Sequence, residues 1–339
     1  MYIMPAEWEK HERTFVEWCV HDSLVFPDNY EEVCNGYAET INAILQFEPV
    51  TVIVNQEDVE KVLKLCPKAS ILIIEHNDAW CRDNGPTFVY DKKGALHGIN
   101  WQFNAWGERF KPYDLDNKVA QKVLSHFNFP CIDSDIVLEG GSIHSNGRGI
   151  ILTTRECLLN KNRNPHLSQE RIEAELKSKL GARQIIWLNK GLFGDETDGH
   201  VDNAACFSDE NTVIIQMCYD KSDENYDITH ENLEILRAVI DENGEKLNII
   251  EIEQPPKRFH GDIRLTLSYI NFYIANGGIV LPVFGEDAID TDKKAEKVIK
   301  SAFPNRRIIT VDGMKLIKEG GNVHCITQQM PLRQRIKKR

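Results

Sequence analysis

Two short segments of the chain repeat a pattern of glutamate, two glycines, a variable residue, an aliphatic residue and histidine. They are LEGGSIH at residues 138–144 and EGGNVHC at residues 319–325, and only the second ends in a thiol, Cys325. Glycines let a ligand come close to the backbone, and a thiol that a nearby cation or base activates is a strong nucleophile. Cys325 is therefore a candidate nucleophile, and a buried structural cysteine is the alternative that this segment leaves open. In an extended segment His324 points away from Cys325, so the base must come from elsewhere.

The segment GHVDN at residues 199–203 is the best source of that base. If it is a strand, His200 and Asp202 face the same side, because side chains alternate along a strand. A histidine exchanges protons near neutral pH, and a carboxylate beside it binds a cation or tunes its pKa. His200 is therefore a candidate general acid and base. A histidine held in a turn next to Asp198 is the alternative.

Two further turns supply carboxylates. WCRDNGP at residues 80–86 carries Asp83 after Trp80, with Arg82 expected to pair inside the protein, and the first Glu-Gly-Gly segment carries Glu139. A simple Asx-turn and an exposed turn carboxylate are the alternatives. Several carboxylates beside one thiol and one imidazole repel one another unless a cation neutralises them, and a guanidinium pairs with carboxylates through its planar fork of donors. The set predicts a site for a guanidinium, whose carbon the thiol would attack.

These polar segments and a fifth, SYINFYIANGG at residues 268–278, lie at the ends of predicted strands and recur at a step of roughly 60 residues, as in a repeat architecture. The predicted strands cover residues 49–54, 70–75, 149–154, 183–188, 212–217, 270–284 and 306–311, and the predicted helices cover 168–180, 231–244 and 290–303. Five such units predict one α/β domain over residues 1–331, a five-bladed pseudo-symmetric α/β propeller with one polar turn per blade facing a common axis. An open α/β sheet has the same alternation, and spacing alone does not exclude it.

The composition is that of a globular protein with an acidic balance. The 339 residues include 52 acidic and 40 basic side chains, which gives a formal net charge of −12. Such a balance disfavours nucleic acid as a partner, and an acidic cleft attracts small cations. No apolar run reaches the roughly 20 residues that a membrane helix needs, and the N-terminus lacks a signal-peptide pattern. We expect a cytoplasmic enzyme with a small cationic substrate, no nucleic-acid or membrane partner, and a disordered basic tail at residues 332–339.

Cysteine and histidine spacing gives no sign of a metal site. Nine cysteines form no C-x-x-C pair, and no H-E-x-x-H motif is present, so neither a zinc site nor a redox dithiol is indicated. Most of these thiols are expected to be reduced and buried, as in a chain without a signal peptide. We expect no metal and no cofactor.

The chain resembles the agmatine deiminases, a bacterial peptidyl-arginine-deiminase-like family of the guanidine-modifying (pentein) superfamily. The resemblance runs nearly end to end and includes NRNPHLS at 162–168, GDETDGHVDN at 194–203 and NVHCITQQ at 322–329. It implies the fivefold propeller, no cofactor, and hydrolysis of agmatine to N-carbamoylputrescine and ammonia through a covalent amidino-cysteine, a step of polyamine biosynthesis. An amidinotransferase, or a deiminase of another guanidino compound such as arginine, is the alternative. A third interpretation is a non-catalytic binding module of the pentein type. We also expect a homo-oligomer.

The resemblance also implies a role for each candidate residue. It implies that Cys325 is the nucleophile, that His200 is the general acid and base, and that Glu139 supports the histidine. It also implies that Asp83 and Asp202 bind the guanidinium. Asp198 and Trp80 are expected to contact the substrate too. Three features depart from the family pattern. Glu319 stands where a glycine is usual, Cys19 stands where proline is common, and the segment 254–262 is short. The first and the last could reshape the mouth of the site.

Overall fold

Strands and helices alternate along the chain in the computed structural model, which describes residues 2–241 and 244–334. Of the tail predicted to be disordered, residues 335–339 lie outside the described residues. Residues 332–334 are ordered instead, because Leu332 N–H donates to the Lys10 carbonyl at 3.2 Å and Arg333 pairs with Glu12 at 3.5 Å. The strands are β1 His11–Glu17, β2 Val50–Val54, β3 Ser70–Ile73, β4 Thr87–Tyr90, β5 Leu96–Gln102, β6 Cys131–Val137, β7 Ile143–Ser145, β8 Ile150–Thr154, β9 Gln184–Leu188, β10 Ala205–Phe207, β11 Thr212–Met217, β12 Asn248–Glu253, β13 Phe259–His260, β14 Ile263–Arg264, β15 Tyr273–Ala275, β16 Gly278–Val283, β17 Arg307–Asp312 and β18 Thr327–Pro331.

One pairing order recurs in five of the sheets that the described residues form. An antiparallel pair is followed by a parallel neighbour in β4–β5–β6, β7–β8–β9, β10–β11–β12 and β15–β16–β17. The sheet β18–β1–β2–β3 has the same order, with β18 antiparallel to β1 and the two following pairs parallel. The remaining sheet is the short hairpin β13–β14.

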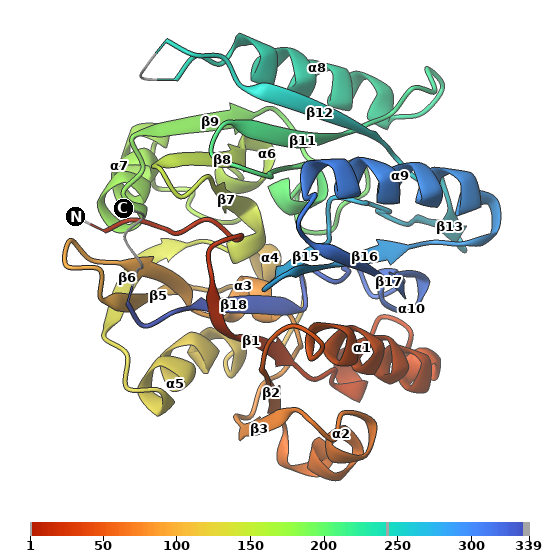
Figure 1. Ribbon diagram of the computed structural model, residues 1–339. Helices are drawn as coiled ribbons and strands as arrows, with labels where there is room; N and C mark the ends of the chain where they lie inside the picture. The colour runs from red at the N-terminus through yellow and green to blue at the C-terminus, as the bar shows by residue number, and fades with distance from the viewer. Residues whose placement is uncertain (1, 242–243, 335–339) are drawn as a thin grey trace.

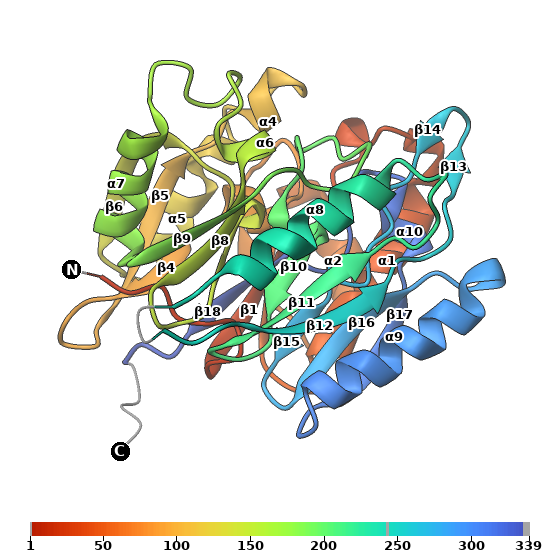
Figure 2. The ribbon, with the colours of Figure 1, turned by 90° about the horizontal axis from the view of Figure 1, so that it is seen from above.

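In each of the five larger sheets a helix connects the parallel strands, because parallel neighbours need a crossover connection. The crossover helices are α1 Tyr30–Ile44, α2 Val59–Leu65, α5 Val119–His126, α7 Gln169–Leu180, α8 Asn225–Ala238 and α9 Ile289–Ala302. They lie around the outside of the molecule, whereas β7, β15 and β18 lie toward its middle (Figures 1 and 2). The short helices α3 Cys81–Asn84, α4 Ala105–Glu108, α6 Arg155–Leu158 and α10 Met314–Ile317 belong to the connections.

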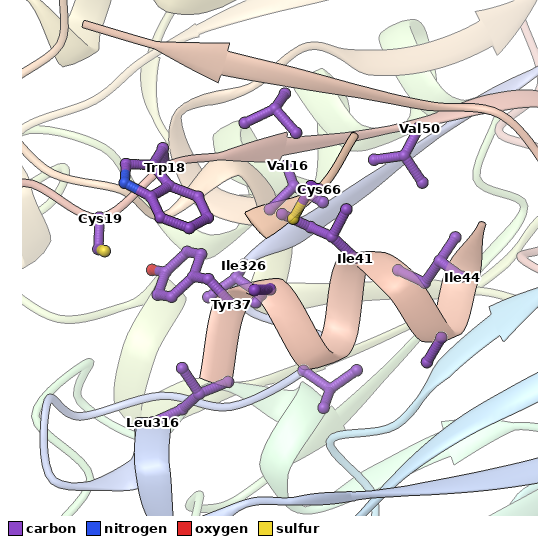
Figure 3. Close-up of a cluster of buried hydrophobic side chains, with 14 of the residues drawn as sticks. Val16, Trp18, Cys19, Tyr37, Ile41, Ile44, Val50, Cys66, Leu316 and Ile326 are labelled. Atoms are coloured by element: carbon purple, nitrogen blue, oxygen red, sulfur yellow. The ribbon is translucent and has the colours of Figure 1, made fainter. Parts of the chain in front are cut away.

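Helix α1 shows how a crossover helix is held on its sheet. Tyr37, Ile41 and Ile44 recur at helical spacing, so one face of the helix is apolar, and all three are buried. This face points at Val16 and Val50 of the neighbouring strands (Figure 3). Burying an aliphatic or aromatic side chain of this size contributes about 1.5–3 kcal/mol to folding. Similar clusters lie under the other helices, so the core is divided among the sheets.

Three predicted elements differ from the structure. The helix expected at 231–244 begins at Asn225 and ends at Ala238, because buried polar residues in its first turns hide the apolar pattern. The strand expected at 270–284 is a hairpin of β15 and β16, since Gly277 turns the chain at φ 79°. The segment with His200 and Asp202 is not a strand: Gly199 has φ 82°, and residues 201–203 form a 3-10 turn.

None of the described helices has the length and apolar character to cross a membrane.

Candidate active site

The five polar turns singled out in the sequence meet at one place and contact one another in a closed series. Gly141 N–H donates to Asp83 Oδ1 at 2.9 Å, and Gly141 also lies close to His200. Asn271 Nδ2 donates to Asn203 Oδ1 at 3.0 Å and to Cys325 Sγ at 3.1 Å. The series closes where Arg82 N–H donates to the Cys325 carbonyl at 3.1 Å. Candidate residues from distant parts of the sequence are thereby brought together.

Cys325 lies in this cluster with its thiol against an amide and a carboxylate. Its Sγ is 3.1 Å from Asn271 Nδ2 and 3.7 Å from Asp202 Oδ2. Burial raises the pKa of the thiol well above its usual value, the Asp202 and Asp83 carboxylates raise it further, and hydrogen bonds from Asn322 and Asn271 counteract part of the shift. In the empty pocket the thiol is therefore protonated at neutral pH. A cation in the pocket would favour the thiolate.

His200 lies between two carboxylates. Its Nδ1 is 3.8 Å from Asp83 Oδ1, and its Nε2 is 3.8 Å from Glu139 Oε2. Burial lowers the pKa of the imidazole, but the carboxylates of Asp83 and Glu139 outweigh this effect and hold it well above its usual value. Both nitrogens then carry protons, so His200 can donate a proton to a leaving group. Nε2 is buried without a hydrogen-bond partner among the described residues.

Glu139 is completely buried and receives its charge partner from a residue to which the sequence assigned no role. Arg163 Nε donates to Glu139 Oε1 at 2.6 Å, and neither side chain is exposed to solvent. Burial raises the pKa of Glu139, but Arg163 and His200 overcome it and hold the pKa at about 2. Glu139 is thus ionised and can stabilise the protonated His200. The signal that could have identified Arg163 is charge balance, since a buried carboxylate requires a cation.

Asp202 is oriented by His324. The Nδ1 atom of His324 is 2.8 Å from Asp202 Oδ2, and its Nε2 is 2.9 Å from Glu7 Oε1, so a carboxylate contacts each ring nitrogen. Burial opposes ionisation of Asp202, but the hydrogen bond and charge of His324, together with His200 and Arg82, outweigh it and lower its pKa. Oδ1 of Asp202 is buried without a hydrogen-bond partner among the described residues, so it is available to a ligand. Arg82 donates to Glu7 at 3.2 Å, which confirms that it pairs inside the protein.

Asp83 is held by one backbone and one side-chain donor. Gly141 N–H donates to its Oδ1, and Trp106 Nε1 donates to its Oδ2, both at 2.9 Å. Burial raises the pKa of Asp83 to about 6; His200 opposes the shift, and Asp202 and Glu139 add to it. A Cβ at Gly141 would lie 2.5 Å from His200 Nδ1 and 2.9 Å from both Asp83 and Asp202, so only glycine fits between these side chains.

The two further predicted contact residues differ in their surroundings. Trp80 lies in the pocket wall with Cys325 and Asp83, and its ring meets that of Trp106 edge to face. The carboxylate of Asp198 is already engaged: its Oδ1 accepts from Arg109 at 2.5 Å and its Oδ2 accepts from Arg163 at 2.6 Å. Asp198 is not among the residues that line the pocket.

The pocket above Cys325 has an acidic wall and aromatic walls. Its acidic residues are Asp78, Asp83, Glu196 and Glu319, and its aromatic residues are Tyr37, Trp80, Trp106 and Phe110. Among the described residues that line it, none is lysine, arginine or histidine. The charge of Arg109 opposes the rise that burial causes in the pKa of Glu196, but Arg109 does not line the pocket and is paired with Asp198. The pocket therefore suits a cation with an apolar stem.

One set of side chains has metal-ligand spacing. Glu139, Cys157 and His200 are buried, and one ligand atom from each lies within 4.8 Å of the others. Arg163 already neutralises Glu139. Burial and the neighbouring Glu139 raise the pKa of the Cys157 thiol, so it is not the thiolate that a metal prefers. The arrangement fits an acid–base histidine with its supporting residues better than a metal site.

The chain matches known proteins over nearly its whole length. It is 39% identical over 359 aligned positions to the agmatine deiminase of Stutzerimonas stutzeri, covering 97% of this chain and 95% of that one. The solved agmatine deiminase of Enterococcus faecalis superimposes with a TM-score of 0.92 at 33% identity, covering 98% and 96% of the two chains. A cysteine-to-serine variant of the C. jejuni agmatine deiminase with substrate bound superimposes with a TM-score of 0.89 at 32% identity, covering 97% and 96%. Residues 3–331 match the family described as Porphyromonas-type peptidyl-arginine deiminase, and this chain belongs to that family.

Proposed function

We propose that this protein is an agmatine deiminase, a hydrolase that converts agmatine and water to N-carbamoylputrescine and ammonia. One observation carries the proposal: a buried thiol faces a pocket whose described lining contains four acidic side chains and no basic one. The guanidinium of agmatine supplies the missing charge at Asp83 and Asp202, and the ammonium at its other end fits the acidic wall. The relatives named agmatine deiminase support the same substrate.

The geometry supports the following reaction. The guanidinium lies against Asp83 and the free Oδ1 of Asp202, and its charge favours loss of the thiol proton from Cys325. The thiolate bonds to the guanidinium carbon, His200 gives its proton to the unsubstituted amino group, and ammonia leaves as the C–N bond breaks. An amidino-cysteine remains. His200 then takes a proton from water, the hydroxide adds to the same carbon, and the C–S bond breaks. The proton of the added hydroxyl passes to the departing sulfur, so the neutral ureido product and the thiol are released.

Glu139 and Asp198 act on this chemistry indirectly. Glu139 stabilises the protonated form of His200, and Arg163 keeps Glu139 ionised. Asp198 pairs with Arg163 and Arg109, so it positions these two side chains without lining the pocket itself. Trp80 lines the pocket together with Asp83, where it covers the substrate. No cofactor is needed for these steps.

We also propose how the whole chain is organised. The pairing order repeated in five sheets, and the five turns in contact at one place, support a five-bladed propeller with the site at its axis, a single domain over residues 1–331. A cytoplasmic location and a homo-oligomeric assembly are part of the proposal; fractionation of cells and light scattering of the purified protein test them.

The function is tested by incubating purified protein with agmatine or arginine alone and measuring ammonia and ureido product. Agmatine should release both without an amine acceptor, which an amidinotransferase would require. The carboxylate of arginine would enter an acidic pocket without a partner, so kcat/KM should favour agmatine by at least about 100-fold. Equal or better turnover of arginine would overturn the assignment to agmatine.

A further inference from the structure

Glu319 lies in the pocket wall six positions before the candidate nucleophile. It follows the short helix α10, where its own N–H donates to the Leu316 carbonyl at 2.9 Å. The next residue, Gly320, has φ 97°, a conformation that favours glycine, and it turns the chain toward Cys325. The side chain of Glu319 is therefore fixed at its base by the same turn that presents the thiol.

One carboxylate oxygen of Glu319 holds a segment from the other end of the chain. Its Oε2 accepts the backbone N–H of Val25 at 2.6 Å and that of Phe26 at 3.3 Å. Residues 23–26, which we call the lip, follow a 3-10 turn, and Ser23, Leu24 and Val25 line the pocket. A second pocket carboxylate holds the lip as well, because Ser23 Oγ donates to Asp78 Oδ1 at 2.9 Å.

The other carboxylate oxygen of Glu319 has no partner. The residue is only 7% exposed, and its Oε1 is buried without a hydrogen bond among the described residues. A buried charged oxygen that is left unpaired costs more than the usual gain of a hydrogen bond, so such an atom in a pocket wall points to a ligand.

The surroundings of Glu319 select the charge of that ligand. Burial raises the pKa of Glu319, the lip N–H groups and Lys318 counteract it, and repulsion by Glu196 adds to the rise. Lys318 itself pairs with Glu32 at 3.1 Å, away from the pocket. Glu196 Oε2 lies 3.1 Å from the position of a Cβ at Gly320, so both acids face the same part of the pocket. A cation here would relieve the repulsion.

We propose that Glu319 is a specificity residue that binds the distal cation of the substrate through Oε1 while Oε2 holds the lip over the pocket. The inference rests on the proposed function and adds to it a second requirement. A substrate must carry a guanidinium at one end and a compact ammonium at the other, and a guanidine with an apolar or anionic tail is a poor substrate.

The test compares agmatine with n-butylguanidine, which has the same stem and ends in a methyl group. The readout is the ratio of kcat/KM for agmatine to that for n-butylguanidine. In Glu319→Gln the amide oxygen still accepts from the lip N–H groups, and only the negative charge is lost. The ratio should fall about tenfold or more, the effect of losing a charged hydrogen-bond partner, while n-butylguanidine turnover stays within about twofold. Glu60→Gln, an exposed acid on helix α2 outside the pocket, is the matched control and should leave the ratio unchanged.

The outcomes separate this inference from the function on which it rests. Wild-type protein that releases no ammonia from agmatine defeats the proposed function. Wild-type activity with an unchanged ratio in Glu319→Gln, or with equal losses for both substrates, assigns Glu319 to the lip alone and overturns the inference. If Glu319→Gln does not fold, as judged by circular dichroism, Glu319→Ala gives the same decision: loss of the lip contact affects both substrates, and only loss of cation binding lowers the ratio.

Discussion

At the scale of single residues, the empty site holds its nucleophile in the unreactive form. Burial and the carboxylates of Asp202 and Asp83 raise the pKa of Cys325, while the same carboxylates attract a guanidinium. Reactivity is therefore coupled to occupancy, because the ligand that brings the electrophilic carbon also brings the charge that favours the thiolate. Without a bound cation, the Cys325 thiol should react slowly with alkylating reagents at neutral pH.

Replacing the reacting groups should stop the reaction at different points. Cys325→Ala should lower ammonia release by about 1,000-fold or more, because no covalent path remains. His200→Ala loses both the acid that protonates the leaving ammonia and the base that activates water, so adduct formation should be slow and its hydrolysis slower still. Mass spectrometry of the intact protein after long incubation with agmatine should therefore detect an amidino adduct. Lys293→Ala, at an exposed position of α9 outside the pocket, serves as a control. Near wild-type turnover in Cys325→Ala would contradict the mechanism.

The acidic limb of the pH profile should belong to Asp83. Its pKa is raised to about 6, so the carboxylate is ionised above that pH and becomes protonated as the pH falls through it. A neutral Asp83 no longer attracts the guanidinium, and kcat/KM for agmatine should therefore fall below about pH 6. The limb in kcat should lie at lower pH, because a bound cation lowers the pKa of Asp83. In Asp83→Asn, kcat/KM should be low at every pH and the limb should be lost; an unchanged limb in that variant would assign it to another group.

At the scale of elements, short irregular connections position the site, and two buried features support them. Helix α4 contains Ala105, Trp106, Gly107 and Glu108 at φ 50°, 53°, 87° and 61°, and this unusual run aims the Trp106 indole at Asp83. Arg163 joins the turns that carry Glu139 and Asp198. A backbone at positive φ in one connection and a buried ion pair in another thus fix the side chains around Asp83 and Glu139.

Removing Arg163 should destabilise the fold as well as the site. Arg163→Ala leaves Glu139 buried without its cation, which costs about 3–5 kcal/mol of unfolding free energy at neutral pH. The charge of Glu139 would then become unfavourable and its pKa would rise, so the loss should shrink as the pH falls through the range in which Glu139 becomes protonated. Urea unfolding at several pH values measures this dependence. Arg237→Ala, on an exposed helix face, is the control, and a loss of similar size there would refute the assignment.

Much of the site could be predicted from the sequence, and the remainder could not for identifiable reasons. Cys325, His200 and Asp83 lie in glycine-containing polar turns, where a functional side chain is recognisable without a structure. The strand expected for His200 and Asp202 was wrong because a glycine at positive φ and a 3-10 turn replace it. Arg163 was missed because no local pattern reveals a buried ion pair between turns distant in the sequence. Helices α7 and α9 begin and end within one residue of the predicted bounds, whereas α1 was not among the predicted helices although its buried face is apolar.

At the scale of the whole molecule, the first strand is completed by the last. β18 pairs antiparallel with β1 from His11 opposite Pro331 to Val16 opposite Thr327, and β1 in turn pairs with β2. The two strands lie side by side in the middle of Figure 1. Met330 in β18 is fully buried in the cluster that contains Phe15 and Phe88, so the final strand belongs to the core of the preceding sheets.

Shortening Met330 should therefore weaken the whole fold. Met330→Ala should lower the unfolding free energy by about 2–5 kcal/mol, because it leaves a cavity between two sheets. Unfolding followed by tryptophan fluorescence and by circular dichroism should give coincident transitions if the sheets unfold together. Gln334→Ala, at an exposed position beyond the strand, should change stability by less than about 0.5 kcal/mol. Separate transitions for the two probes would show that the final strand is independent.

The pairing of β1 with β18 also sets a timetable for biosynthesis. A ribosome adds roughly 5–20 residues each second, so β1 waits from about a quarter of a minute to a minute before its antiparallel partner leaves the exit tunnel. During that interval one edge of β1 has no strand to pair with and must be shielded by water or by a chaperone. Asp83 is made early, whereas Cys325 arrives in the stretch just before β18. The growing chain therefore contains the Asp83 carboxylate, which would bind the guanidinium, long before it contains the Cys325 nucleophile.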